Sequence, residues 1–250
     1  EFMSPPPAEA MTRALELLYA LGALDDYCKL TKPIGTTLSE IPVEPRFARM
    51  LIASGEMGCS EEILSIASML SVPHVFLSPR GSIQKAMKAK RKFSVTEGDH
   101  LTLLNVFNSF QLQQHNSKWC QDRFLNIRAL RRAVEIRKHL RRYLKRFKIP
   151  IVTCAGDIVT IRRCIVCGFF SNAAQLQPDG SYKTVRGHEQ LQIHPSSVLF
   201  REASEWVVYH DLVLTTKKFM RDVSTIEPRW LSELAPQFYE YQGPTCHQVE

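Results

Sequence analysis

Apolar and polar side chains alternate along the last third of the chain. An extended strand would divide residues 217–226 between two faces, Phe219, Arg221, Val223 and Thr225 on one and Met220, Asp222, Ser224 and Ile226 on the other. Residues 206–215 are rich in β-branched and aromatic side chains, which also favours a strand. A helix over 157–167 and three shorter strand-like runs precede them, with a tight turn at 178–180. The pattern predicts a small five-stranded β-barrel with strand centres at Phe169, Tyr182, Leu191, Trp206 and Phe219.

The start of the chain has apolar residues every three or four positions, which is the period of an amphipathic helix. We expect a first helix that Ser4 caps and Gly22 ends. A turn-rich insert follows over 23–41, and residues 46–53 begin the next helix. The predicted buried stripe of the first helix is Met11, Ala14, Leu15, Leu18 and Leu21.

Residues 55–150 read as an almost entirely helical bundle. Ile63, Ile66, Ala67 and Leu70 are spaced for burial on one helix, and a basic helix over 85–93 follows. Asp99 is placed to cap a strongly apolar helix that contains Leu101, Leu104 and Phe107.

A long basic helix ends the bundle. Ten of the chain's 32 basic residues and only one of its 25 acidic residues lie between Arg128 and Lys148, so the formal excess of +7 is concentrated there. At about 100° per residue the apolar side chains form one stripe, and basic side chains cover the opposite side. The stripe consists of Ala133, Ile136, Leu140, Tyr143, Leu144 and Phe147.

Three interpretations of this basic face compete. It is a solvated helix surface, a membrane-surface contact, or a surface for a polyanion. The self-repulsion of so many cations favours a polyanionic partner, either nucleic acid or an acidic protein. No lipid-anchor motif is visible, and no apolar run approaches the roughly 20 residues that cross a bilayer. We therefore expect no membrane partner.

Candidate catalytic and metal-binding groups have simpler structural explanations. No nucleophile or third catalytic partner stands at a recognisable spacing from Asp99 and His100. We therefore expect Asp99 to cap a helix and the His100 imidazole to be packed in the core. Cys164 and Cys167 form a single C-x-x-C without a second pair, which favours buried structural thiols over zinc ligands. Trp119 is expected to anchor the bundle core. Seven cysteines without a scaffold spacing suit a reducing compartment.

Three segments resemble the C-terminal region of DEAH-box RNA helicases. IHPSSVLF (193–200), WVVYHDLVLTTKKFMRDVSTI (206–226) and WLSELAP (230–236) resemble the family's OB-fold. EGDHLTLLNVF (97–107) and KWCQDRFLN (118–126) resemble its helical bundle, or ratchet domain. SPPPAEAMTRALELLYALGALDD (4–26) resembles the later part of its winged-helix domain. The sequences of these segments are most similar to those of spliceosome-associated members. The resemblance implies an α+β chain with a winged-helix part at 4–54, a helical bundle at 55–150 and an OB-fold at 151–243.

The resemblance further implies that the chain forms one wall of a single-stranded RNA tunnel against RecA-like motor domains. It also implies a nuclear, spliceosomal setting. A translocating enzyme holds RNA without reading its sequence, so phosphate contacts are expected. The candidate RNA contacts are Ser196, Ser197, Thr215, Thr216, Lys217, Lys218 and Arg221 in the barrel, and Arg137, Arg141 and Lys145 on the basic helix.

A second interpretation is a docking module for protein partners. The resemblance implies that a G-patch activator packs on the winged-helix part, where residues 8–24 carry apolar side chains. Spliceosomal proteins are the other expected partners. No G-x-x-x-x-G-K-[ST] loop and no Asp-Glu-Ala-His box occurs. The chain alone is therefore expected to bind neither ATP nor Mg²⁺ and not to hydrolyse ATP, whereas the longer parent enzyme would use both.

Overall fold

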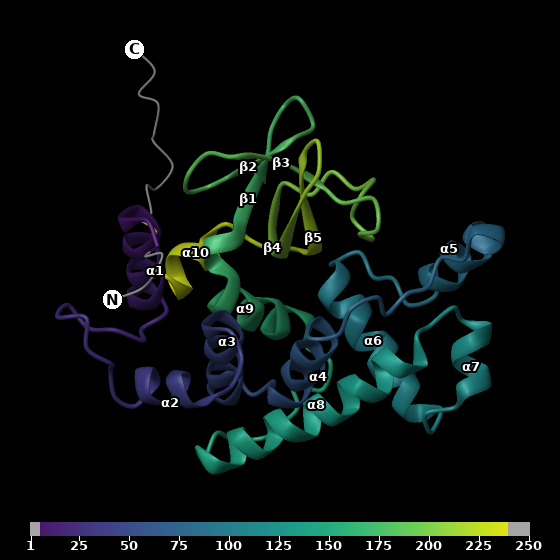
Figure 1. Cartoon of the computed structure of the whole chain (residues 1–250), viewed down its shortest axis with the longest axis horizontal. Helices are drawn as coiled ribbons and strands as arrows, with labels where there is room; N and C mark the ends of the chain where they lie inside the picture. Colours follow the sequence, from purple (N-terminus) through teal and green to yellow (C-terminus); the bar gives the residue numbers. More distant parts are fainter. Residues whose placement is uncertain (1–5, 240–250) are drawn as a thin grey trace.

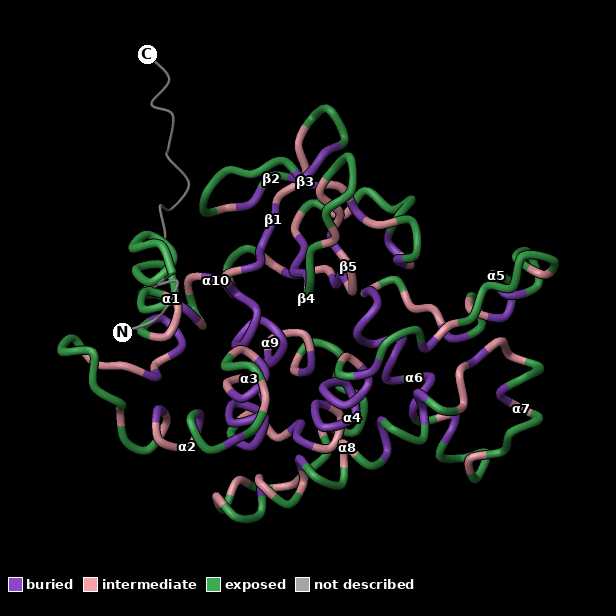
Figure 2. The backbone as a smooth tube through the Cα atoms, viewed as in Figure 1, coloured by how far each residue is buried: buried purple, intermediate pink, exposed green. Residues whose placement is uncertain are grey.

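The computed structural model describes residues 6–239 (Figure 1). A helical body carries a small β-barrel on one side, and a short C-terminal helix returns beside the first helix. Burial is concentrated in the helices beneath the barrel and in the barrel interior (Figure 2). Within the described residues no helix is both long and apolar enough to cross a membrane.

The first unit consists of α1 (Ala8–Ala20), α2 (Ile34–Glu40) and α3 (Pro45–Glu56), joined by loops. Gly22 ends α1 with a positive φ of 74°, as expected. The predicted cap, Ser4, lies outside the described residues. The buried stripe is wrong over its first half: Met11, Ala14 and Leu15 are exposed, and Leu21 is buried. Periodicity identified the apolar face of α1, but nothing in the described part of the chain covers its N-terminal half.

The helical bundle follows the predicted pattern. Its helices are α4 (Ser60–Leu70), α5 (Ile83–Arg91), α6 (Asp99–Leu112), α7 (Ser117–Asp122) and α8 (Ile127–Arg146), with a short 3-10 turn, η1 (Arg80–Ser82), before α5. Trp119 is half-buried and packs edge-on to Phe93, with ring centroids 6.0 Å apart. It contributes to the bundle core, as predicted.

Helix α8 presents the predicted faces. Asn126 caps it by accepting hydrogen bonds from the backbone N–H groups of Arg128 and Ala129. Ala133, Leu140 and Leu144 are buried, and the remaining members of the apolar stripe are half-buried. The stripe packs α8 against α4 and the bundle core.

The third unit begins with α9 (Ile158–Phe169), whose N-terminus Asp157 caps. A 3-10 turn, η2 (Phe170–Asn172), leads into a closed barrel with the order β1-β2-β3-β5-β4. The strands are β1 (Ala173–Leu176), β2 (Tyr182–Thr184), β3 (Gln190–Ile193), β4 (Trp206–Leu214) and β5 (Lys218–Thr225). Five strands were expected, but the first was misplaced: Phe169 is the buried last residue of α9. Helix α10 (Arg229–Leu234) follows and buries Trp230.

A candidate nucleic-acid interface where the bundle meets the barrel

The start of α6 touches the barrel at Gly98. Its backbone bridges to Ser224 of β5, and Thr225 N–H donates to the Glu97 carbonyl at 3.0 Å. Gly98 has a φ of 125°, and a Cβ atom there would lie 2.3 Å from the Val223 carbonyl oxygen. Only glycine allows the two backbones to approach this closely.

Asp99 connects α6 to two segments of the barrel unit. It was predicted to cap α6, and this is wrong, because its side chain makes no cap hydrogen bond. The buried carboxylate instead accepts from Ser197 Oγ at 2.5 Å and from the backbone N–H groups of Val198 and Val223, each at 2.9 Å. Burial raises the pKa of Asp99, and Lys90 and these donors act against the rise. Asp99 therefore holds the turn after β3 and strand β5 on the bundle.

His100 is the packed imidazole that was expected. It is fully buried, and its Nδ1 lies 2.8 Å from Ser224 Oγ. Burial lowers its pKa to about 4, so the ring is neutral at pH 7. It therefore contributes packing and one hydrogen bond to the contact between bundle and barrel.

Four residues that surround the turn after β3 form what we call the cationic cluster: Lys90, His194, Ser196 and Arg221. Lys90 Nζ reaches from α5 to donate to the Ser196 carbonyl and lies 4.7 Å from the centroid of the Phe76 ring. Burial first, and then the charges of Arg221 and Lys90, lower the pKa of His194. His194 Nδ1 lies 2.7 Å from Ser196 Oγ, and the His194 backbone N–H donates at 2.9 Å to the carbonyl of Met220, the residue before Arg221. Ser196 is exposed beside them.

The seven barrel candidates do not form one surface. Arg221 and Ser196 belong to the cationic cluster, whereas Thr215, Thr216 and Lys217 are exposed at the tip of the β4–β5 hairpin. Arg221 lies three residues along β5 from Lys218, or about 10 Å at 3.3 Å per residue. Lys218 Nζ is paired with Glu189 at 2.7 Å. Ser197 is buried and its hydroxyl donates to Asp99, so its role in this conformation is structural.

The basic face of α8 is partly neutralised by the fold. Arg137 and Arg141 pair with Glu61 of α4 at 2.5 Å and 2.6 Å. Burial acts to raise the pKa of Glu61, but hydrogen bonds from these two guanidinium groups outweigh it and lower the pKa. Arg146 pairs with Glu40. Among the candidates on α8, Lys145 is exposed and forms no ion pair with any residue from 6 to 239.

Sequence reasoning missed the importance of α5, and with it Lys90. From Ile63 to Thr96 the chain has six basic residues and no acidic residue. The positive excess is therefore shared by two segments and is not confined to α8. The run Lys88-Ala89-Lys90-Arg91-Lys92 could have indicated it, but this run is shorter than the basic run of α8. His194 was missed because a single histidine carries no pattern.

The two thiols of the C-x-x-C are buried, as predicted. Cys164 and Cys167 are buried in α9, and burial raises the pKa of Cys167 to about 11. A neutral thiol is a poor nucleophile and a poor metal ligand. No group of three or more His, Cys, Asp or Glu residues is arranged for a metal ion within residues 6–239.

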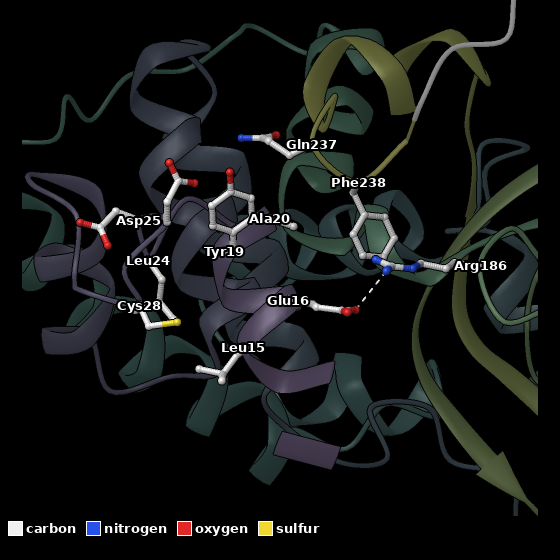
Figure 3. Close-up of a pocket in the computed structure, with 11 residues that line it drawn as sticks. Leu15, Glu16, Tyr19, Ala20, Leu24, Asp25, Cys28, Arg186, Gln237 and Phe238 are labelled. Carbon is white, nitrogen blue, oxygen red and sulfur yellow. Dashed lines mark hydrogen bonds and ion pairs between the residues drawn. The ribbon is translucent and has the colours of Figure 1, made fainter. Parts of the chain in front are cut away.

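A second candidate surface lies on α1. Met11, Leu15 and Tyr19 are 50%, 40% and 42% exposed and follow one another at four-residue spacing. A pocket of about 400 Å³ beside them is closed on its far side by Phe238 and Arg186 (Figure 3). Arg186 pairs with Glu16 at 3.0 Å and so joins the barrel unit to α1.

Comparisons with known proteins match the chain in three consecutive parts. Family models match residues 14–43 (helicase associated domain HA2, winged-helix), residues 44–103 (helicase associated domain HA2, ratchet-like) and residues 161–239 (oligonucleotide/oligosaccharide-binding fold). The probable ATP-dependent RNA helicase DHX35 of Pongo abelii is 49% identical over 98% of this chain and 34% of its own length. The protein of the same name from Homo sapiens is 49% identical over 96% of this chain and 34% of its length.

A third relative is named as a splicing factor. The pre-mRNA-splicing factor ATP-dependent RNA helicase prp22 of Schizosaccharomyces pombe is 43% identical over 96% of this chain and 21% of its own length. The chain thus spans about a third of the two DHX35 proteins and about a fifth of prp22.

Proposed function

The chain belongs to the DEAH-box RNA helicase family, of which it carries winged-helix, ratchet-like and OB-fold domains, and from this premise we propose that it holds single-stranded RNA by its backbone. The observation that carries the proposal is the cationic cluster. Lys90 of the bundle and His194, Ser196 and Arg221 of the barrel unit surround one turn, where Lys90 donates to the Ser196 carbonyl and His194 contacts the Ser196 hydroxyl and the residue before Arg221. Cations and hydroxyl groups that bind phosphate positions without reading base edges suit a protein that moves along RNA.

Within a longer helicase we propose that this surface forms one wall of an RNA tunnel against RecA-like motor domains. Those motor domains would bind ATP and Mg²⁺, since this chain has no phosphate loop to hold them. The similarity to prp22, a pre-mRNA-splicing factor, supports a nuclear role in splicing with spliceosomal partners. We retain 4–54, 55–150 and 151–243 as the proposed domain limits.

We expect the double variant Lys90→Met/Arg221→Ala to bind labelled oligouridine about tenfold more weakly than the wild type. Removal of two phosphate-binding cations should also make the slope of log affinity against log salt concentration shallower by about 1.4. Fluorescence anisotropy over a salt series measures both quantities. Lys217→Ala/Lys218→Ala, tested beside it, reports separately on the hairpin tip.

Lys29→Ala/Lys183→Ala is the matched control, because it removes the same charge from exposed positions outside the cationic cluster. Its affinity should stay within about twofold of the wild type. Equal losses in the control and in the Lys90/Arg221 variant would mean that net charge alone attracts RNA, and the proposal would be abandoned.

The exposed apolar face of α1 supports a second function, docking of a G-patch activator or another protein helix. Met11, Leu15 and Tyr19 form a four-residue repeat beside the pocket, and this repeat fits a helix that packs along α1.

We expect Met11→Ser/Leu15→Ser to weaken binding of a G-patch peptide without changing the affinity for oligouridine. Raising salt from about 50 mM to about 200 mM should hardly change peptide affinity, whereas RNA affinity should fall steeply. Calorimetric titration of the peptide at both salt concentrations tests this, and a steep salt dependence of peptide binding would argue against apolar docking.

A further inference from the structure

Helix α5 has a basic surface that the fold leaves unbalanced. We define the α5 surface as Arg80, Ile83, Lys85, Met87, Lys88, Arg91 and Lys92, all of which are exposed. The whole stretch from Ile63 to Thr96 contains no acidic residue. None of the five cations of this surface forms an ion pair with any residue in the described part of the chain.

The contrast with α8 is informative. On α8 the fold supplies Glu61 for Arg137 and Arg141, and Glu40 for Arg146. On α5, which lies at the edge of the molecule in Figure 1, no comparable acid is supplied. The longer basic run is thus partly neutralised, and the shorter one retains its full charge. Unbalanced positive charge at an edge attracts a negatively charged partner.

The α5 surface also includes apolar side chains. Ile83 and Met87 are 49% and 50% exposed and stand one helical turn apart, so they form a continuous ridge. Helix α5 turns Ala86 and Ala89 inward and thus buries only small side chains. A large aliphatic residue left on the outer side is not needed for the core.

The side chains of this ridge favour a protein over RNA. At about 100° per residue Arg91 and Lys90, which contacts the Ser196 carbonyl, lie beside the ridge, whereas the outer lysines Lys88 and Lys85 lie roughly 100–160° around the helix from it. The outer lysines point roughly 140–160° away from Lys90, so a strand held at the cationic cluster would not also follow them. Stacking of bases uses aromatic side chains, and aliphatic ridges of Ile and Met are typical of helix-binding surfaces.

We propose that the α5 surface docks an acidic amphipathic helix of a partner protein. Apolar side chains of the partner, four residues apart, would pack on Ile83 and Met87, and its flanking carboxylates would face Arg91 and Lys88. Helix α5 is nine residues long, or about 13 Å, so about three turns of a partner helix would cover it. This contact does not depend on the proposed RNA binding.

The test uses the full 250-residue chain and a designed peptide of about 14 residues, helical, rich in Glu and with Leu at four-residue spacing. We expect Ile83→Ser/Met87→Ser and Lys88→Glu/Arg91→Glu each to weaken its binding at least about tenfold. Leu112→Ser, at a position 81% exposed, and Arg132→Glu/Arg142→Glu on α8 are the matched controls and should leave binding unchanged. Fluorescence anisotropy of the labelled peptide gives the affinities.

A peptide of the same composition with the leucine spacing scrambled separates docking from general charge attraction. Equal binding of the scrambled peptide, or equal losses in the α8 control, would overturn the proposal. So would α5 variants that lose affinity for oligouridine and not for the peptide, since the surface would then belong to RNA. Methyl resonances of Ile83 and Met87 in the wild-type protein should shift on addition of the peptide, and unchanged resonances would also overturn the proposal without any variant.

Discussion

Replacement of Gly98 by alanine is expected to lower the free energy of unfolding by about 3–5 kcal/mol, through backbone strain and overpacking together. The new methyl group would lie 2.3 Å from the Val223 carbonyl oxygen and 2.6 Å from Ser224 Cα, both of which are backbone atoms of β5. Neither atom can move without disturbing the strand. The φ of 125° adds strain that alanine cannot relieve. Urea unfolding followed by circular dichroism measures the change.

Gly58→Ala separates the two causes of this loss. Gly58 also has a positive φ, 72°, but an added Cβ would meet nothing within 4 Å. Its replacement should cost about 1–2 kcal/mol, from backbone conformation alone. If both variants lost the same stability, the close approach of α6 to β5 would have no energetic importance, and the account of the contact at Gly98 would be wrong.

Asp99→Ala should destabilise the protein by about 3–5 kcal/mol, because it leaves three buried or half-buried donors without an acceptor. These donors are the Ser197 hydroxyl and the N–H groups of Val198 and Val223. The turn after β3 would also lose its attachment to α6, so Ser196 would be held less firmly beside Lys90. We therefore expect affinity for oligouridine to fall together with stability. Urea unfolding and anisotropy measure the two effects.

Asp157→Ala is the matched control for this carboxylate. Asp157 also accepts three hydrogen bonds, from Val159 N–H, Thr160 N–H and the Thr160 hydroxyl, but it does so at the exposed start of α9. Water can replace the lost acceptor there, so the change should cost about 1 kcal/mol. A loss for Asp99→Ala no larger than this would show that Asp99 does not join bundle and barrel.

Gly98 and Asp99 lie at the same contact between α6 and β5, and this contact also positions the cationic cluster. The cationic cluster draws Lys90 from the bundle and its other members from the barrel unit. Its geometry therefore depends on how α6 sits on β5, which Gly98 and Asp99 determine. A change at either residue should act on RNA affinity even though Gly98 has no side chain and Asp99 is buried.

The sequence by itself determined the type of most elements, because periodicity is local. The alternation over 217–226 placed β5 but not its faces: Met220 and Val223, expected on opposite faces, are both buried in the barrel core, because Asp222 between them has a φ of 51° and interrupts the alternation. The apolar stripe of α8 was correct in every position named. The three resembling segments also gave the order of helical units and barrel that the family comparisons show. The burial of Cys164 and Cys167 in α9 was also predicted, because the sequence has no second pair of metal-ligand residues near them.

The tertiary structure decided what each face meets. An apolar stripe on α1 was readable, but whether anything covers Met11 and Leu15 depends on residues far along the chain. Asp99 stands where a helix cap is expected, yet its carboxylate accepts hydrogen bonds from residues about 100 or more positions further along the chain, the most distant of which is Val223. Glu61 neutralises part of α8 in the same long-range manner. Local sequence specifies the direction of a side chain relative to its own helix or strand, and only the packing of distant segments specifies its partners.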